Sequence, residues 1–162
     1  MSQSLDNTVI ISSFYTAFQK RDYKKMQSLY HDNATFSDPI FSNLNAKQVK
    51  AMWQMLLTTG KDLTVTFSNV DASDGRGLCH WDAFYTFSRT GNKVHNIVDA
   101  DFEFLDGKIL KHTDHFNFWK WSRQAFGLTG VILGWTSVFH NKVRTTAQEG
   151  LSKFIAKSAA NS

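Results

Sequence analysis

Proline and cysteine each occur only once in this sequence of 162 residues. The lone cysteine, Cys79, cannot form a disulfide within the chain, so we expect a protein of a reducing compartment, by default the cytoplasm. The lone proline, Pro39, directly follows Asp38. Proline fixes its own φ angle and keeps the preceding residue extended. The sequence therefore singles out Asp38, either as a buried proton acceptor or as the start of an ordinary surface turn.

Long hydrophobic runs are absent, and so is a basic leader followed by an apolar stretch and a small-residue cleavage site. The apolar run at residues 130–135 is far shorter than the roughly 20 residues that cross a bilayer. We therefore expect no transmembrane segment. Hydrophobic residues make up 42% of the chain and aromatic residues 14%, which excludes general disorder and predicts one compact core.

Positive charge is in excess only towards the C-terminal end. Residues 1–118 hold 12 Lys or Arg against 13 Asp or Glu, whereas residues 119–162 hold six against one. A basic surface attracts anionic lipid or nucleic acid, but cations as widely spread as these also form the solvated face of a helix. We favour the solvated face and expect no nucleic-acid partner. Weak contact with a membrane surface stays open.

Three amphipathic helices are expected in the first 60 residues. Apolar residues recur at helical spacing in residues 11–18, and a shorter helix begins after Asp22. Asn45 and Gln48 form a capping-box pair in front of a third helix, whose apolar stripe ends at Gly60.

Alternation of apolar and polar residues replaces helical spacing from residue 63 onward. Strands are expected at residues 63–68, 78–88, 94–104 and 109–118. Turns at residues 71–77 and at Asp106-Gly107 should join them as antiparallel hairpins. A short helix should end before Gly127, and an amphipathic helix should include residues 143–155. The prediction is an α+β fold: a cone-shaped, curved antiparallel sheet with N-terminal helices over its concave face, and a C-terminal helical extension.

Residues 29–39, LYHDNATFSDP, join a helix end to a short strand that stops at Asp38-Pro39. With the order of elements, this segment resembles the nuclear transport factor 2-like superfamily, particularly its SnoaL-like and ketosteroid isomerase-like branch. The resemblance spans residues 4–126, and residues 114–127 are similar to uncharacterised bacterial members. It implies a cone domain at residues 1–126 with a small-molecule pocket. Residues 127–162 are the C-terminal extension, packed on the same domain.

The resemblance assigns the role of general base to Asp38, because the aspartate before proline has this role in the ketosteroid isomerase-like branch. The place of that branch's oxyanion tyrosine falls on Phe14, with Tyr15 beside it, and the place of the second oxyanion acid falls on Ala100. Neither phenylalanine nor alanine has a side-chain hydrogen-bond donor. The resemblance thus implies proton transfer without the apparatus for steroid isomerisation.

The last expected strand supplies further candidates. Alternation puts Leu110, His112, Asp114 and Phe116 on one face, which the family register directs toward the cavity. An imidazole with two carboxylates can divide acid and base roles. Asp114 is the nearest match to the acid/base aspartate of SnoaL-like cyclases, and Asn117 is the other possible match. A purely structural His112–Asp114 pair is the alternative.

Aromatic residues and one amide are the candidates for substrate contact: Phe14, Tyr15, Tyr30, Trp53, Asn96, Phe102 and Phe116. Trp81 and Tyr85 also fit the lining of an apolar cavity. Simple core packing is the other explanation for such residues. The six histidines and Cys79 show no metal-ligand spacing, so neither a metal nor an organic cofactor is expected.

Residues 127–138 form an apolar segment that covers the cone, contacts a second subunit or lies on a membrane surface, and we favour the first two. The leading hypothesis is a cytoplasmic, homodimeric enzyme of the isomerase, cyclase or hydrolase type, which moves protons on an apolar carbonyl-bearing or cyclic molecule. Asp38, His112 and Asp114 are its expected catalytic residues. A non-catalytic module that binds a small ligand or dimerises is the alternative, because Phe14 and Ala100 lack donors.

Overall fold

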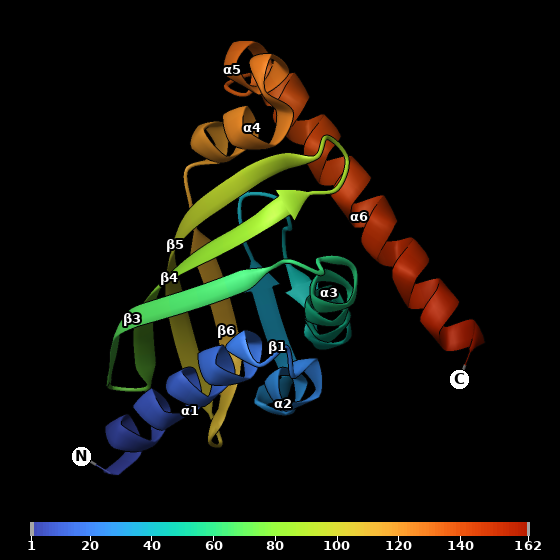
Figure 1. Cartoon of the computed structure of the whole chain (residues 1–162). Coiled ribbons are helices and arrows are strands. Elements are labelled where there is room, and N and C mark those ends of the chain that lie inside the picture. Colours follow the sequence, from blue (N-terminus) through green and yellow to red (C-terminus); the bar gives the residue numbers. More distant parts are fainter. Residues whose placement is uncertain (1, 162) are drawn as a thin grey trace.

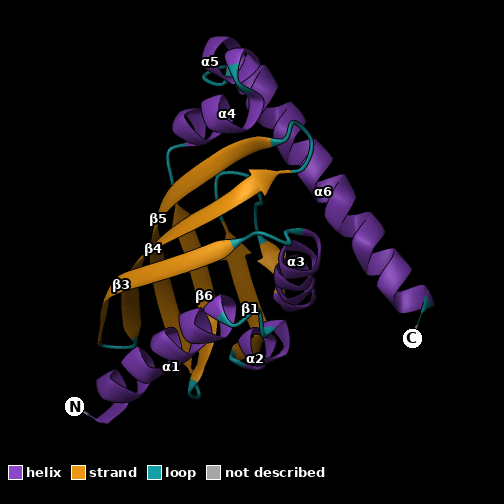
Figure 2. Cartoon of the chain, in the orientation of Figure 1, coloured by secondary structure: helices purple, strands orange, loops and turns teal. Residues whose placement is uncertain are grey.

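A computed structural model describes the backbone of residues 2–161 and the side chains of residues 6–161. The helices are α1 (Ser2–Gln19), α2 (Tyr23–Ser28), α3 (Ala46–Thr59), α4 (Phe118–Phe126), α5 (Leu128–Leu133) and α6 (Ser137–Ala160). The strands are β1 (Tyr30–Ser37), β2 (Leu44–Asn45), β3 (Thr64–Ser73), β4 (Arg76–Phe87), β5 (Asn92–Leu105) and β6 (Lys108–His115). Figure 1 shows these helices and strands coloured along the sequence, and Figure 2 shows them coloured by secondary structure. Their combination confirms the predicted α+β class.

The strands form one curved sheet in the order β2-β1-β6-β5-β4-β3. The four strands from β3 to β6 are connected by successive hairpins, so each pairs antiparallel with the next. β2 also pairs antiparallel with β1. β1 and β6 pair in parallel, with Phe36 opposite His112, which differs from a fully antiparallel sheet. The cause is a crossover: α3 carries the chain from β2 at one edge to β3 at the other, and the hairpins return it beside β1.

Helices α1, α2 and α3 cover the concave side of the sheet (Figure 1). The predicted capping box of α3 is confirmed: Asn45 Oδ1 accepts from the Gln48 N–H at 3.0 Å, and Gln48 Oε1 accepts from the Asn45 N–H at 2.9 Å. This exchange satisfies two backbone donors at the helix start. The inward stripe of α3 consists of Val49, Met52, Trp53 and Leu57.

Aromatic side chains fill the space between these helices and the sheet. Phe14 of α1 lies edge-on to five rings, with centroid distances from 5.2 to 6.5 Å. These rings belong to Tyr15, Tyr30, Trp53, Phe102 and His112. None of the six side chains is more than 2% exposed. Edge-to-face pairs add to the stability gained by burial, so this cluster is the centre of the core.

Strand β6 departs from strict alternation at Leu110. The register shifts between Glu103 and Phe104 of β5, so Leu110 has no partner residue there. Ile109 consequently packs in the core, and Leu110 is only half-buried. The prediction that Leu110 faces inward together with His112 is wrong for this reason, whereas His112 itself is buried as expected.

Three helices follow the sheet. Asn117, the second candidate for the acid/base position, is exposed and caps α4 by accepting from the Lys120 N–H at 2.9 Å. α6 begins earlier than predicted, at Ser137, because the Thr136 side chain caps it. It then runs beside α3, with Leu151 fully buried (Figure 1). Among the described residues, no helix combines the length and the apolar character needed to cross a bilayer.

Candidate functional site

Asp38 follows β1 and begins a tight turn that contains Pro39. Its Oδ1 accepts from the backbone N–H of Ile40 at 2.7 Å and of Phe41 at 2.6 Å, and its own N–H donates to the Phe41 carbonyl at 2.8 Å. A turn in which an aspartate side chain accepts from the backbone N–H two residues later is an Asx turn. Both bonds end on Oδ1, so Oδ2 is the oxygen left outside the turn.

Asp38 and Pro39 are half-buried in this turn, and loss of solvent there changes the acidity of Asp38. Burial is the main cause that raises the pKa of Asp38 from 3.8 to about 7, and the negative charge of Asp114 raises it further. The two N–H groups of the turn and the guanidinium of Arg144 act in the opposite direction. Arg144 lies close because its Nε donates to the Pro39 carbonyl at 2.9 Å. Asp38 therefore changes protonation near neutral pH.

His112 and Asp114 lie next to each other on the concave face of β6. His112 Nε2 is 2.9 Å from Asp114 Oδ1, and His112 Nδ1 is 2.7 Å from the Tyr30 hydroxyl. The Trp53 indole N–H donates to the Tyr30 oxygen at 2.9 Å, and that of Trp81 donates to Asp114 Oδ1 at 3.3 Å. His112 is fully buried and Asp114 is 3% exposed. Five side chains thus form one hydrogen-bonded chain inside the core.

Donors and acceptors along this chain assign its protons. The Trp53 indole can only donate, so the Tyr30 oxygen accepts from it and the Tyr30 O–H donates to His112 Nδ1. Nε2 of His112 then carries the ring proton and donates it to the Asp114 carboxylate. Every member has a partner in this assignment, and a buried network of this kind makes a core rigid. The arrangement fits the structural interpretation of the His112–Asp114 pair.

The relation of Asp38 to this pair is electrostatic. The Asp114 charge contributes to the raised pKa of Asp38, yet no described hydrogen bond joins Asp38 to His112 or Asp114. Both nitrogens of His112 already have partners within the core. Joint action of the three residues on one substrate stays a prediction.

Most of the predicted substrate contacts lie deep in the core. Phe14, Tyr30, Trp53 and Phe102 belong to the aromatic cluster, where packing accounts for their positions. Tyr15 is also fully buried, burial raises the pKa of its hydroxyl, and that hydroxyl has no hydrogen-bond partner among the described residues. Asn96 and Phe116 are partly exposed. A molecule approaching this set meets these two side chains first.

Two pockets on the surface lie away from the three predicted catalytic residues. One, of about 440 Å³, is lined by α1 and the start of α2, from Thr8 to Lys25. The other, of about 640 Å³, lies on the outer face of β3, β4, β5 and β6, between Asp71 and His115. Neither contains Asp38, His112 or Asp114 in its lining. Asp38 itself is half-buried.

Tyr85, one of the residues predicted to fit the lining of an apolar cavity, adjoins the site. Its partner Trp121 was not among the predicted contacts. The Trp121 indole N–H donates to the Tyr85 oxygen at 2.8 Å. Burial raises the pKa of Tyr85 to about 12, and the Asp38 charge contributes to this rise, which places the two side chains within electrostatic reach. Alternation with Trp81 pointed to an inward Tyr85, but nothing local in the sequence indicated its bond to Trp121.

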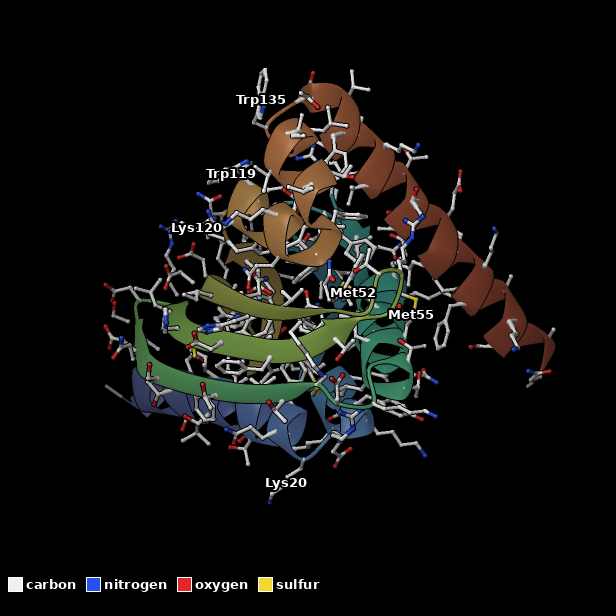
Figure 3. All side chains as sticks on the ribbon, turned by 45° about the horizontal axis from the view of Figure 1, so that its top comes forward. Lys20, Met52, Met55, Trp119, Lys120 and Trp135 are labelled. Atoms are coloured by element: carbon white, nitrogen blue, oxygen red, sulfur yellow. The ribbon has the colours of Figure 1, made fainter. Side chains whose placement is uncertain are left out.

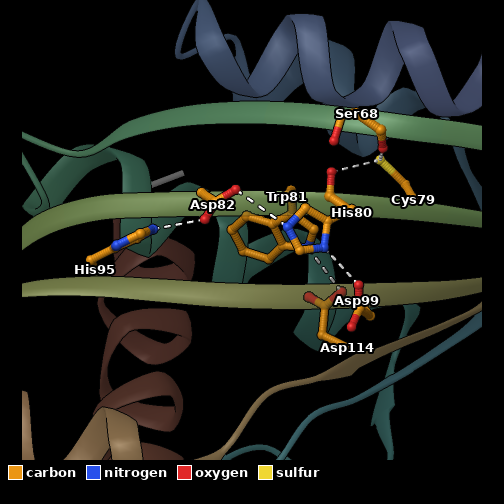
Figure 4. A network of polar contacts seen from close by, with 8 residues as sticks. All are labelled: Ser68, Cys79, His80, Trp81, Asp82, His95, Asp99 and Asp114. Carbon is orange, nitrogen blue, oxygen red and sulfur yellow. Dashed lines mark hydrogen bonds and ion pairs between the residues drawn. The ribbon is translucent and has the colours of Figure 1, made fainter.

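Other histidines lie on the outer face of the sheet. His80 Nδ1 is 2.7 Å from Asp99 and His95 Nε2 is 2.7 Å from Asp82, in exposed pairs. Figure 4 shows these pairs together with the inward Trp81–Asp114 contact. No group of three or more histidine, cysteine or acidic side chains within the described part of the chain is arranged to hold a metal ion.

The observed fold agrees with the family that the sequence matches. The model of the SnoaL-like domain family matches residues 11–112, well over half of the chain. The chain belongs to the SnoaL-like domain family. This range includes Asp38 and His112 and ends before Asp114. No characterised protein sequence matches the chain significantly.

Several solved structures share this fold. An M. tuberculosis LEH-like epoxide hydrolase has 14% identity and a TM-score of 0.62, over 85% of this chain and 97% of its own. An NTF2-like protein of unknown function from Burkholderia pseudomallei has 15% identity and a TM-score of 0.66, over 75% of this chain and 98% of its own. A putative polyketide cyclase from Xanthomonas campestris has 16% identity and a TM-score of 0.64, over 75% of this chain and 98% of its own. Identities this low show the nuclear transport factor 2-like fold alone.

Proposed function

We propose that this SnoaL-like protein is a small-molecule enzyme that transfers a proton on an apolar carbonyl-bearing or cyclic substrate, with Asp38 as general base. The Asp38 carboxylate removes a proton from the carbon next to the carbonyl, and the bonding electrons move onto the carbonyl oxygen. Where a carbon–carbon double bond adjoins that carbon, the proton returns to the far end of the conjugated enolate and the double bond shifts, so the isomerisation balances without a redox partner. Neighbours of the same fold that are described as a cyclase and an epoxide hydrolase support an enzymatic role.

The acidity of Asp38 is the observation that carries the proposal. A general base works best when its pKa is near the working pH, and the pKa of Asp38 is raised to about 7. The turn holds Oδ1 with two hydrogen bonds, so the carboxylate has a fixed orientation and Oδ2 takes the proton. Ile40 and Phe41 of the same turn supply apolar side chains beside Asp38, which favours an apolar substrate.

Tyr85 supplies the hydrogen bond that Phe14 lacks. Its oxygen accepts from Trp121, so its O–H proton remains available for a substrate oxygen. A donor aimed at the developing charge of an enolate lowers the barrier of such a reaction. Asp114 acts as the electrostatic partner that keeps the pKa of Asp38 high. His112 is a positioning residue, since it holds Asp114 through Nε2.

Proton exchange with solvent tests the proposal directly. Hydrophobic ketones and lactones that raise the melting temperature are incubated with the protein in deuterium oxide, and mass spectrometry detects deuterium at the carbon. Asp38→Asn should abolish the exchange, and Tyr85→Phe should slow it by about a hundredfold. Asp106→Asn, at an exposed turn of the same fold, is the control and should exchange normally. Undiminished exchange in Asp38→Asn would remove Asp38 from the mechanism.

A non-catalytic ligand-binding module is the second candidate. The filled aromatic core and the satisfied hydrogen bonds of His112 favour it. This alternative predicts ligands that raise the melting temperature of the wild type and of Asp38→Asn equally, with neither deuterium exchange nor conversion.

A homodimer and a cytoplasmic location belong to the same proposal. The outer sheet face exposes Leu78, Phe84 and Ile97 between the His–Asp pairs, which supports contact with a second copy. Light scattering after size-exclusion chromatography measures the assembly. A monomeric mass at micromolar concentration would contradict the dimer.

A further inference from the structure

Six large apolar side chains are exposed on α5, at the start of α6 and between these two helices. They are Leu128, Val131, Ile132, Leu133, Trp135 and Val138, with exposed fractions from 44% to 79%, and we call them the apolar tip. α5 lies at the opposite end of the molecule from α1 and α2 (Figure 1). Trp135 projects outward on the same side as Trp119 and Lys120 (Figure 3). An exposed apolar group of this size usually marks a site of interaction.

The inner side of α5 is made of its smallest residues. A Cβ added to Gly130 would lie 2.0 Å from the carbonyl oxygen of Ser122, and one added to Gly134 would lie 2.1 Å from the Ser122 Oγ. α5 therefore packs against α4 through glycines, while its leucine, isoleucine and valine side chains remain exposed. A helix that serves only the core of its own chain has the opposite arrangement.

Polar contacts hold α5 in this orientation. The Trp119 indole N–H donates to the Val131 carbonyl at 3.3 Å, and His140 Nε2 lies 2.9 Å from the carbonyl oxygen of Gly134. The side chain of Thr136 caps the following helix. The apolar tip is thus displayed on a fixed platform, which reduces the loss of conformational freedom when a partner binds.

The stretch of sequence that contains the apolar tip carries charge of one sign. Residues 117–148 contain two lysines and two arginines and neither aspartate nor glutamate. The Arg123 guanidinium lies 4.9 Å from the ring centroid of Trp119, so a cation adjoins an exposed indole. Tryptophan rings and basic side chains are enriched where proteins meet the membrane–water interface.

We infer that the apolar tip binds the surface of an anionic membrane. The aliphatic side chains enter the headgroup region, Trp119 and Trp135 lie at the interface, and Lys120 and Arg123 meet lipid phosphates. A second copy of the chain fits this surface less well, because two tips would bring cations together without an acidic partner. The inference is independent of the chemistry proposed for Asp38.

Vesicle co-sedimentation of the full chain tests this inference. Vesicles that contain phosphatidylglycerol in phosphatidylcholine are compared with vesicles of phosphatidylcholine alone. We expect binding to the mixed vesicles, weaker binding to the neutral ones, and a loss of the difference at high salt. Absence of binding to the mixed vesicles overturns the inference.

Matched variants separate the apolar and the charged contributions. Ile132 and Val9 of α1 are both 63% exposed, so Ile132→Ser should lower the partition coefficient about tenfold and Val9→Ser should not change it. Lys120→Gln should lower it about fivefold, whereas Lys20→Gln, at the opposite end of the molecule (Figure 3), should not. Equal losses within each pair would overturn the assignment to the tip.

Light scattering of the vesicle-free protein examines the other possible occupant. An oligomer that Ile132→Ser dissociates, together with failure to bind mixed vesicles, would overturn the inference in favour of a second copy. An unchanged mass in Ile132→Ser, together with its loss of vesicle binding, supports the membrane surface.

Discussion

Replacing Asp38 by asparagine separates the charge of this side chain from its hydrogen bonds. The amide oxygen of asparagine can accept from the N–H groups of Ile40 and Phe41 as Oδ1 does now. The variant has no carboxyl group to ionise, so it keeps the turn and loses the buried charge. Its stability relative to the wild type therefore reports the cost of ionising Asp38.

The magnitude follows from the two pKa values. An unfolded aspartate ionises near its ordinary pKa of 3.8, whereas folding raises the pKa of Asp38 to about 7. The folded chain therefore binds more protons than the unfolded chain in this interval, and the free energy of unfolding decreases as pH rises through it. Roughly three pKa units at about 1.4 kcal/mol each give a loss of about 4 kcal/mol.

Urea unfolding of both proteins across pH measures this loss. The stability of Asp38→Asn minus that of the wild type should increase by about 4 kcal/mol between about pH 4 and about pH 8, and then level off. Val9→Ser changes an exposed side chain without a titrating group, so its difference from the wild type should stay constant. A difference for Asp38→Asn that does not change with pH would refute the raised pKa and remove the main support for a general base.

Three other predictions concern buried groups. Tyr30→Phe leaves two polar partners unsatisfied and should lower the free energy of unfolding by about 2–3 kcal/mol, whereas Tyr15→Phe should not lower it. Urea unfolding measures both variants. A larger loss in Tyr15→Phe than in Tyr30→Phe would contradict the hydrogen-bonded network. Gly130→Ala forces a Cβ to within 2.0 Å of the Ser122 carbonyl oxygen, so it should lower the melting temperature, and an unchanged value would refute the tight packing. Burial raises the pKa of Cys79 to about 12, so a disulfide reagent should label it only after unfolding; fast labelling of the native protein would contradict this.

Features that close within a few residues were predictable from the sequence. The capping box at Asn45 depends on Gln48 three positions later, and the turn at Asp106-Gly107 depends on positive φ angles that these residues adopt readily. Both lie where their patterns predicted them. The turn at residues 71–77 proved shorter, because Ser73 still pairs with β4.

Features that join distant parts of the chain were not predictable in the same way. Arg144 contacts the Pro39 carbonyl from 105 positions away, and no local pattern indicates such a pair. The inward Asp114 followed from alternation, but its bond from Trp81 depends on the register between three strands. Asp38 was predicted either as a buried proton acceptor or as the start of a turn, and it starts a turn in which it is half-buried. The filled core around Phe14 depends on how five elements pack together.

The parallel pairing of β1 with β6 has a consequence for the order of folding. Strands β3 to β6 can associate through successive hairpins, whose contacts are close in sequence, whereas the Tyr30–His112 bond spans 82 positions. Contacts of such long range form slowly, because a large loop must close first. The sheet should therefore be completed last at the β1–β6 seam, and substitutions of Tyr30 should speed unfolding far more than they slow refolding.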